Sequence, residues 1–341
     1  MKELFGLTLS ELKELVAEKG LPSFTAKQIS EWLYKKRVRT IDEMTNISLK
    51  NRLLLEQTFQ ISRTEPVHFQ ESVDGTKKYL FRTTSGQFIE TVYIPEEDRN
   101  TLCVSSQVGC KMNCKFCMTG KMGFVEQLQV SDILNQILSI PESQKLTNIV
   151  FMGMGEPFDN LESLMKVLEI VTSDYGLAWS PRRVTVSTIG HLKGMKFFLE
   201  NSECHLALSL HSPFHAERLS LMPIEKAYPL LDVLAEIKKY DFSKQRRVSF
   251  EYIMFNDLND TIRHAIELVK ILKGISCRVN LIRFHAIPGA DLKTSDNSKM
   301  ITFRDYLTSN GIMTTIRKSR GEDIFAACGM LSTEKKNQTE K

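Results

Sequence analysis

Two kinds of hydrophobic pattern divide the chain. In residues 1–60, apolar positions recur every three or four residues, which predicts short amphipathic helices. Thr8 with Glu11 and Thr25 with Gln28 have capping-box spacing, so helices are expected to begin there. Residues 77–94 instead alternate apolar and polar positions on either side of "TSG", which predicts a β-hairpin. We therefore expect an N-terminal accessory module of helices plus hairpin over residues 1–95.

From about residue 100 onward, β-rich apolar runs alternate with amphipathic helical stretches. This order predicts a parallel sheet whose strands are joined by right-handed helical crossovers. Six units fall short of the eight that close a full barrel, so the expected fold class is α/β with a partial (β/α)6 barrel. We place this core at residues 96–330 and expect a disordered tail over 331–341. The expected strands are 101–106, 147–152, 182–187, 204–210, 246–254 and 277–282.

Composition and charge narrow the class of protein. The 341 residues are 42% hydrophobic and 25% charged, which excludes wholesale disorder. The sequence contains neither a run of eighteen apolar residues nor a secretory cleavage site, so we expect no membrane span and a cytoplasmic location. The seven cysteines are not spread as a disulfide framework, which agrees with a reducing compartment. A net charge of +4 permits a polyanionic partner without establishing one.

Three cysteines are concentrated in one short segment. Cys110, Cys114 and Cys117 lie within "GCKMNCKFCMTGKMGF", directly after the first expected barrel strand. A structural zinc site needs four ligands, usually as two separated pairs, and no second pair follows. A [4Fe–4S] cluster usually takes four cysteines, so three would leave one iron open to a bound small molecule. The spacing therefore indicates a metal or cofactor loop.

Small and polar residues follow the next three strands. "MGMGEP" places Gly155 and Glu156 after the second strand, where glycine lets the backbone approach a ligand and the carboxylate can accept from an ammonium group. Ser187 ends the third strand, and "SLH" ends the fourth with Ser209, Leu210 and His211. Taken singly, each of these is equally consistent with ordinary turn or strand-end chemistry.

Together these motifs resemble the radical S-adenosylmethionine (SAM) RNA adenine methyltransferases. The resemblance rests on five stretches between residues 89 and 329: "ETVYIPEEDRNTLCVSSQVGCKMNCKFCMTGKMGF", "MGMGEP", "VTVSTIG", "LALSLHSP" and "RKSRGEDIFAACG". It implies a [4Fe–4S] cluster held by the three clustered cysteines, with SAM chelated to the open iron and contacted by the strand-end residues. One electron, from a flavodoxin- or ferredoxin-type donor, splits SAM into methionine and a radical. The family also implies a monomer.

The resemblance also implies three catalytic residues outside the cluster loop. Cys328 would carry a methyl group that becomes a carbon radical and adds to the adenine ring, which links protein to RNA. Cys103 would attack the Cys328 sulfur, release the product and leave a disulfide. Glu90 would handle the proton on C2. His285 occupies the position of a SAM-contacting Asn in the family, and its imidazole can also donate and accept hydrogen bonds.

The expected substrates are one adenine of 23S rRNA, in the peptidyl transferase centre, and adenosine 37 of some tRNAs. Pro157 matches the branch that methylates C2, whereas a sister branch with Ala at this position methylates C8 and is the alternative. A zinc-stabilised RNA-binding protein is a second alternative, from another class. Groups that could contact RNA phosphates are 35–39, Lys115, Lys121, Arg182–Arg183, Arg246–Arg247 and 317–320.

Overall fold

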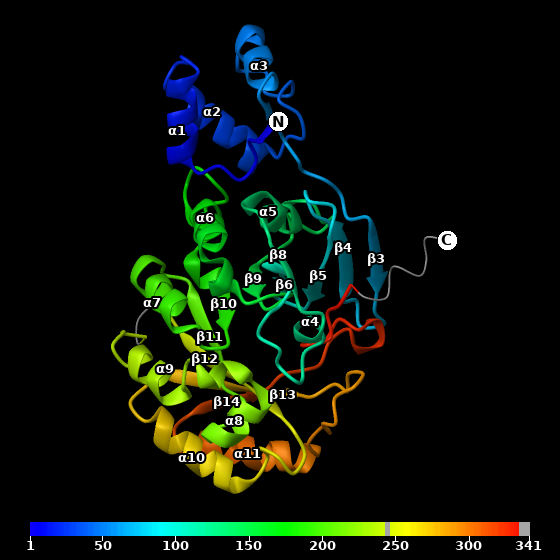
Figure 1. Ribbon diagram of the computed structural model, residues 1–341, viewed down its shortest axis with the longest axis vertical. Coiled ribbons are helices and arrows are strands. Elements are labelled where there is room, and N and C mark those ends of the chain that lie inside the picture. Colours follow the sequence, from blue (N-terminus) through cyan, green and yellow to red (C-terminus); the bar gives the residue numbers. More distant parts are fainter. Residues whose placement is uncertain (243–245, 334–341) are drawn as a thin grey trace.

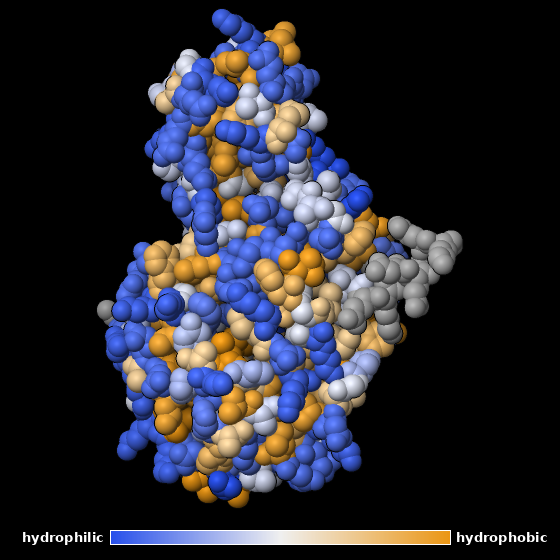
Figure 2. Space-filling view, in the orientation of Figure 1, coloured by the Kyte–Doolittle hydropathy of each residue, from blue (hydrophilic) through white to orange (hydrophobic). Residues whose placement is uncertain are grey.

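The computed structural model describes residues 1–242 and 246–333. A small helical part projects from a larger α/β part, and the space-filling view shows a narrowing between the two (Figures 1 and 2). Most of the tail that we expected to be disordered, residues 334–341, lies outside the described residues. In the described part of the chain, no helix is both long enough and apolar enough to cross a bilayer.

The projecting part is built from the helices that the N-terminal pattern predicts. Thr8 and Glu11 form the expected capping box, and Leu12, Leu15 and Val16 face the interior. No side-chain cap is present at the second helix, whose N-cap is Phe24 rather than Thr25. A short parallel pair of strands closes the unit. Its elements are α1 (Leu9–Glu18), α2 (Thr25–Ser30), a π-helix (Glu31–Lys36), α3 (Leu49–Glu56), β1 (Lys2–Glu3) and β2 (Phe59–Gln60).

One large sheet organises the rest of the described residues. Its order is β14-β13-β12-β11-β10-β9-β6-β5-β4-β3, parallel from β14 to β6 and antiparallel from β6 to β3. All six expected barrel strands are present, as β6 (Asn100–Cys103), β9 (Asn148–Phe151), β10 (Val184–Thr188), β11 (His205–Ser209), β12 (Val248–Met254) and β13 (Cys277–Arg283). A seventh, β14 (Met313–Ile316), extends the parallel run.

The N-terminal hairpin belongs to this same sheet. The expected pair is β4 (Lys77–Arg82) and β5 (Phe88–Pro95), with β3 (His68–Glu71) outside it. β5 pairs with β6, so a boundary at residue 95 passes through the sheet, and the helical part is separate from the hairpin. A small second ribbon consists of β7 (Gln107–Gly109) and β8 (Phe124–Gln127), which flank the cysteine segment.

Helices cover the outer face of the parallel strands (Figure 1). They bury apolar side chains such as Val167, Phe198 and Leu268 against the outward-facing strand residues. The helices are α5 (Val130–Leu138), α6 (Leu161–Thr172), α7 (Leu192–Asn201), α8 (His215–Leu221), α9 (Leu230–Ile237), α10 (Ile262–Leu272) and α11 (Asn297–Ser309). The short helix α4 (Met118–Lys121) instead belongs to the cysteine segment. Short 3₁₀ turns occupy 157–160, 181–183, 223–226 and 322–324.

Candidate active site

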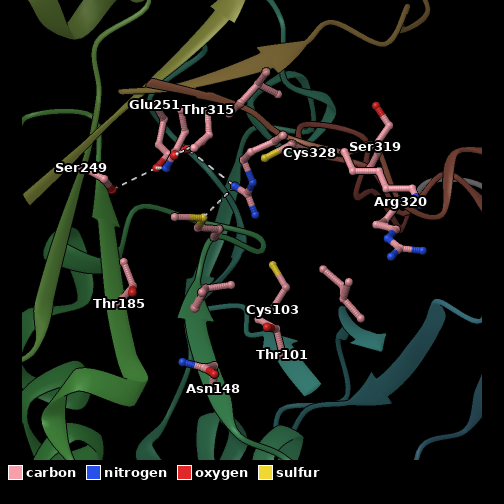
Figure 3. Close-up of a pocket in the computed structure, with 18 of the residues that line it drawn as sticks. Thr101, Cys103, Asn148, Thr185, Ser249, Glu251, Thr315, Ser319, Arg320 and Cys328 are labelled. Carbon is pink, nitrogen blue, oxygen red and sulfur yellow. Dashed lines mark hydrogen bonds and ion pairs between the residues drawn. The ribbon is translucent and has the colours of Figure 1, made fainter. Parts of the chain in front are cut away.

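Two cavities meet inside the curved sheet, and the Cys328 segment forms their common wall. The smaller cavity lies at the carboxyl ends of the strands and is lined by the three clustered cysteines and the strand-end motifs. The larger one, of about 560 Å³, runs down the inner face of the strands and contains Cys103. Cys328, Arg317 and Glu251 line both. Figure 3 shows Cys103 and Cys328 projecting toward the interior of the larger cavity from different segments.

The cysteine segment is a tight loop held by its own backbone. Cys110 N–H donates to Gly123 O at 2.9 Å, and Cys117 N–H donates to Cys114 O at 3.1 Å. A side chain at Gly109 could not fit, because its Cβ would lie 1.9 Å from Gly123 O and its φ is +71°. Burial raises the pKa of the Cys110 thiol to about 12, so bare thiols here stay protonated and would release protons on binding iron.

The donor set fits an iron–sulfur cluster better than a single ion. Within the described residues, no three Cys, His, Asp or Glu side chains are grouped tightly enough to share one metal ion. A [4Fe–4S] cluster does not require such grouping, because each thiolate bonds a separate iron. Cys110, Cys114 and Cys117 line one cavity, and no fourth cysteine joins them there except Cys328 on the opposite segment.

Glu156 is pre-positioned beside the cysteine loop. Its carboxylate accepts from Thr188 Oγ1 at 2.7 Å, from Ile189 N–H at 3.0 Å and from Phe158 N–H at 3.2 Å. Gly155 allows this approach, because a Cβ there would lie 2.5 Å from Gln107 Cβ. Burial raises the pKa of Glu156 to about 7. An ammonium group bound beside it would favour the charged carboxylate, as the amino group of SAM requires.

The polar strand ends contribute further groups to the smaller cavity. Ser187 and Ser209 line it together with His211, whereas the Leu210 side chain is buried elsewhere in the core. His211 Nδ1 accepts from Ile253 N–H at 3.0 Å, and burial lowers its pKa to about 3. The imidazole is therefore neutral and carries its proton on Nε2, which makes His211 a hydrogen-bond donor.

The Cys328 segment is docked directly onto the cysteine loop. Met118 N–H donates to Gly329 O at 2.8 Å, and Thr119 Oγ1 donates to Leu331 O at 2.8 Å. Gly329 has φ of +81°, and a Cβ there would lie 2.9 Å from Phe116 O, so this approach requires glycine. The Cys328 side chain is exposed to the cavity, whose walls raise the pKa of its thiol.

Cys103 faces the same space from the end of β6. Burial, and next the Cys328 sulfur, raise the pKa of the Cys103 thiol to about 12, while the Arg317 guanidinium acts in the opposite direction. Arg317 Nη1 lies 3.6 Å from Glu251 Oε2 and 3.7 Å from Met152 Sδ. Both cysteines are free thiols, so the disulfide implied by the resemblance is not formed in this state.

Glu251 anchors that arginine. Its Oε1 accepts from Ser249 Oγ at 3.0 Å and from Asn280 Nδ2 at 2.8 Å (dashed lines in Figure 3). Its Oε2 is buried and accepts no hydrogen bond, and only the ion pair with Arg317 faces it. Glu251 belongs to none of the sequence motifs, and its carboxylate becomes informative only because the structure shows it buried.

Glu90 is buried at the other end of the Cys328 segment. Its Oε1 lies 3.3 Å from Lys78 Nζ, and its Oε2 accepts from Ser332 N–H at 3.0 Å. Lys78 also donates to Phe325 O at 3.4 Å. Glu90 does not line either cavity but contacts the residue next to Leu331, which lines both.

His285 is separate from the expected SAM-binding residues. It lines the larger cavity, where its Nε2 lies 3.0 Å from Ser319 Oγ and its Nδ1 3.7 Å from Glu322 Oε2. The structure therefore brings together the three clustered cysteines with Gly155, Glu156, Ser187, Ser209 and His211, but not His285 or the Leu210 side chain.

Comparison with known proteins shows the family to which this chain belongs. Residues 104–269 match the model of the Radical SAM superfamily, and residues 2–61 match that of the ribosomal RNA large subunit methyltransferase N-terminal domain. A probable dual-specificity RNA methyltransferase RlmN of Parabacteroides distasonis is 63% identical over 98% of this chain and 97% of its own. The dual-specificity RNA methyltransferase RlmN of Desulfotalea psychrophila is 39% identical over 97% of this chain and 95% of its own.

A solved structure agrees with these relatives. A radical SAM methyltransferase from Sphaerobacter thermophilus superposes with a TM-score of 0.90 at 38% identity, covering 97% of this chain and 99% of that one. The match therefore includes the helical N-terminal part as well as the barrel. The chain belongs to the RlmN family of dual-specificity RNA methyltransferases, within the radical SAM superfamily.

Proposed function

We propose that this protein methylates C2 of a specific adenine in 23S rRNA and of adenosine 37 in some tRNAs, in the cytoplasm. The observation that carries the proposal is the meeting of two cavities at Cys328: one has the ligands for a cluster and SAM, and the other has room for a base. The relatives' names, which specify RNA methyltransferases of dual specificity, support the substrate class. We also propose a monomer served by a flavodoxin- or ferredoxin-type donor.

Cys110, Cys114 and Cys117 would hold a [4Fe–4S] cluster, and Gly155, Glu156, Ser187, Ser209 and His211 would bind SAM. Together these cofactors supply methyl groups and a hydrogen-abstracting radical. The carbons of an adenine ring resist attack by an electrophilic methyl group, so the chain itself must carry the methyl as a carbon-centred reagent. Cys328 is placed for that role, because it is exposed between the two cavities.

Two other side chains complete the proposed cycle. Glu90 takes the proton from C2 after the carbon bond forms, and reaches the base only once its contact with Ser332 opens. The Cys103 thiolate then attacks the Cys328 sulfur and forms a disulfide, and the carbon–sulfur bond breaks with its electron pair on carbon. That carbon takes up a proton to become the methyl group, and the odd electron left by radical addition would pass to the bound cluster, so the methylated base is freed. Cys103 fits this role because its thiol faces the Cys328 segment in one cavity. The helical part, residues 1–61, is proposed to contact RNA outside the barrel.

The test is nucleoside analysis of rRNA and tRNA from cells with and without the gene. We expect 2-methyladenosine to disappear from both pools when the gene is deleted. Chromatographic comparison with 2-methyl- and 8-methyladenosine standards separates the two branches, and 8-methyladenosine as the sole product would overturn the C2 assignment. Pro157 supports the C2 assignment only by resemblance.

A further inference from the structure

The inner face of the sheet is polar, unlike the interior of a closed barrel. Residues of closed eight-stranded barrels fill the centre with layers of branched aliphatic side chains. Here the residues that alternate toward the larger cavity are mostly hydroxyl, amide or charged ones, and Figure 3 shows several of them facing one space. They are Thr101, Asn148, Thr185, Ser249, Asn280 and Thr315. This face is therefore a lining for a polar ligand rather than a packed core.

Basic side chains gather where the strands begin. Arg182 lies two residues before β10, Arg247 immediately precedes β12 and Arg278 is the second residue of β13. All three line the larger cavity. Because parallel strands start at the same edge of a sheet, these arginines surround one opening, which we call the basic mouth. It lies at the opposite end of the strands from the cysteine loop.

The electrostatics of the mouth point to an anionic ligand. Its neighbour His205 has a pKa lowered to about 4, first by burial and then by Arg247, Arg278 and Arg182. Within residues 1–242 and 246–333, no carboxylate forms an ion pair with any of these three arginines. Glu96 and Glu251 are the carboxylates that line the cavity, and Glu251 already faces Arg317. The cluster of positive charge is thus unneutralised.

The size of the larger cavity indicates whether the nucleic acid enters as a single strand or as a duplex. A volume of about 560 Å³ is typical of a pocket for a small molecule, so it accommodates a nucleotide or two of unpaired strand. A cavity of this size has no room for a paired double strand, so the RNA must enter it unpaired. Guanidinium groups bind phosphate oxygens in a bidentate manner, and they suit a strand whose bases have been turned out of their stack.

We propose that RNA enters the barrel through the basic mouth, with Arg182, Arg247 and Arg278 contacting phosphates that flank the target adenine. The base then extends along the polar lining toward Cys328, at the far end of the same cavity. RNA and SAM consequently approach Cys328 from opposite ends of the strands. This inference rests on the proposed function, because it takes RNA as the substrate.

The chain provides matched controls for this route. Arg183 follows Arg182 directly, yet its guanidinium carbon lies 5.9 Å from the centre of the Trp179 ring and it does not line the cavity. Arg246 precedes Arg247 but is buried, and its Nη1 donates to Leu199 O at 2.8 Å. Arg183 is the better control, because like Arg182 it is exposed and can be replaced without disturbing the core.

The experiment measures RNA binding and protein methylation separately. Anaerobic holoprotein is titrated by fluorescence anisotropy against a labelled RNA stem–loop with the target adenine in its loop, at several KCl concentrations. R182Q, R247Q and R278Q should each weaken binding and lower the slope of log K against log[KCl] by about 0.7, while R183Q leaves both unchanged. The triple variant should lower the slope by about 2.

Methylation of Cys328, read as a mass increase of the protein without RNA, should be equal in all variants and shows that each is folded and loaded. If R183Q weakens binding as much as the mouth variants, or if the triple variant binds like the unmodified protein, the route is wrong. If the unmodified protein binds the stem–loop but never methylates it, the proposed function fails instead.

Discussion

Cys103 and Arg317 illustrate how much a single side chain depends on its neighbours. The Cys103 thiol is buried and close to a second sulfur, and both conditions favour the protonated form that cannot act as a nucleophile. Arg317 is the neighbouring cation that favours the thiolate, and its 3.6 Å ion pair with Glu251 is not accompanied by a hydrogen bond to Oε2. The guanidinium therefore has donors to spare for a thiolate.

Replacing Arg317 with Met should slow product release. Without the guanidinium the pKa of Cys103 rises further, so the thiolate fraction falls at any pH below that pKa, by roughly tenfold for each pKa unit. We expect the pH profile of release to shift to higher pH and the protein–RNA adduct to accumulate at neutral pH, measured by denaturing gel electrophoresis. Lys318→Met, in the same cavity, serves as the control for simple loss of charge. Equal profiles for the two variants would contradict this role.

Cys103→Ala should block release of the protein–RNA adduct completely. With no thiol to attack the Cys328 sulfur, RNA should remain covalently attached to the protein, and mass spectrometry of a nuclease and protease digest should place it on Cys328. Cys204→Ala is the control, because that buried cysteine lines neither cavity. Multiple turnovers by Cys103→Ala would show that another group resolves the adduct.

At the scale of elements, the most consequential contact joins the C-terminal segment to α4. Two hydrogen bonds, from Met118 N–H to Gly329 O and from Thr119 Oγ1 to Leu331 O, hold the segment of Cys328, the proposed methyl carrier, against the cysteine loop. At its outer end the same segment is tied to Glu90 through Ser332 N–H. These three contacts follow Cys328 in the chain, and before it Lys78 Nζ donates to Phe325 O at 3.4 Å. The segment is thus attached on both sides of Cys328, and the Cys328 side chain stays accessible.

Thr119→Val should loosen this attachment without unfolding the protein. It leaves the buried Leu331 carbonyl without its donor, at a cost of about 1–3 kcal/mol. We expect faster hydrogen exchange in residues 326–332 and a lower rate of Cys328 methylation. The midpoint of global thermal unfolding should change little. Thr308→Val, on the exposed face of α11, is the control. Unchanged exchange in that segment would mean that this hydrogen bond does not hold it.

The sequence pattern predicted where helices and strands lie better than it predicted which side chains meet in the folded protein. Alternation and amphipathic spacing located all six expected barrel strands, because those strands are apolar on their outer side. β14 was missed because "MTTI" is short, half polar and runs into a basic stretch. The clustered cysteines and the strand-end motifs were found because each motif is a short continuous stretch of sequence. Glu251, Lys78 and the contrast between Arg182 and Arg183 depend on which way a side chain faces, and no local pattern determines that.

At the scale of the whole molecule, the sheet runs without a break from the antiparallel hairpin to the last parallel strand. This continuity places Glu90 on β5 and Cys103 on β6 in adjacent strands. The hairpin, which the sequence associates with the N-terminal helices, therefore belongs to the sheet that positions the proposed active site. Residues 2–61 alone match the N-terminal domain model, which agrees with the structural division after β2.

The polar inner face of the barrel has a consequence for how such an enzyme diversifies. Apolar packing that stabilises the fold lies between the sheet and its outer helices, whereas the polar residues lining the larger cavity are not part of the hydrophobic core. Substitutions on the lining can then accumulate at small cost to folding, since surface-like positions tolerate change far better than core positions. If RNA follows the proposed route, foldability and substrate choice are carried by opposite faces of the same strands, and single substitutions in the lining are expected to change the RNA target.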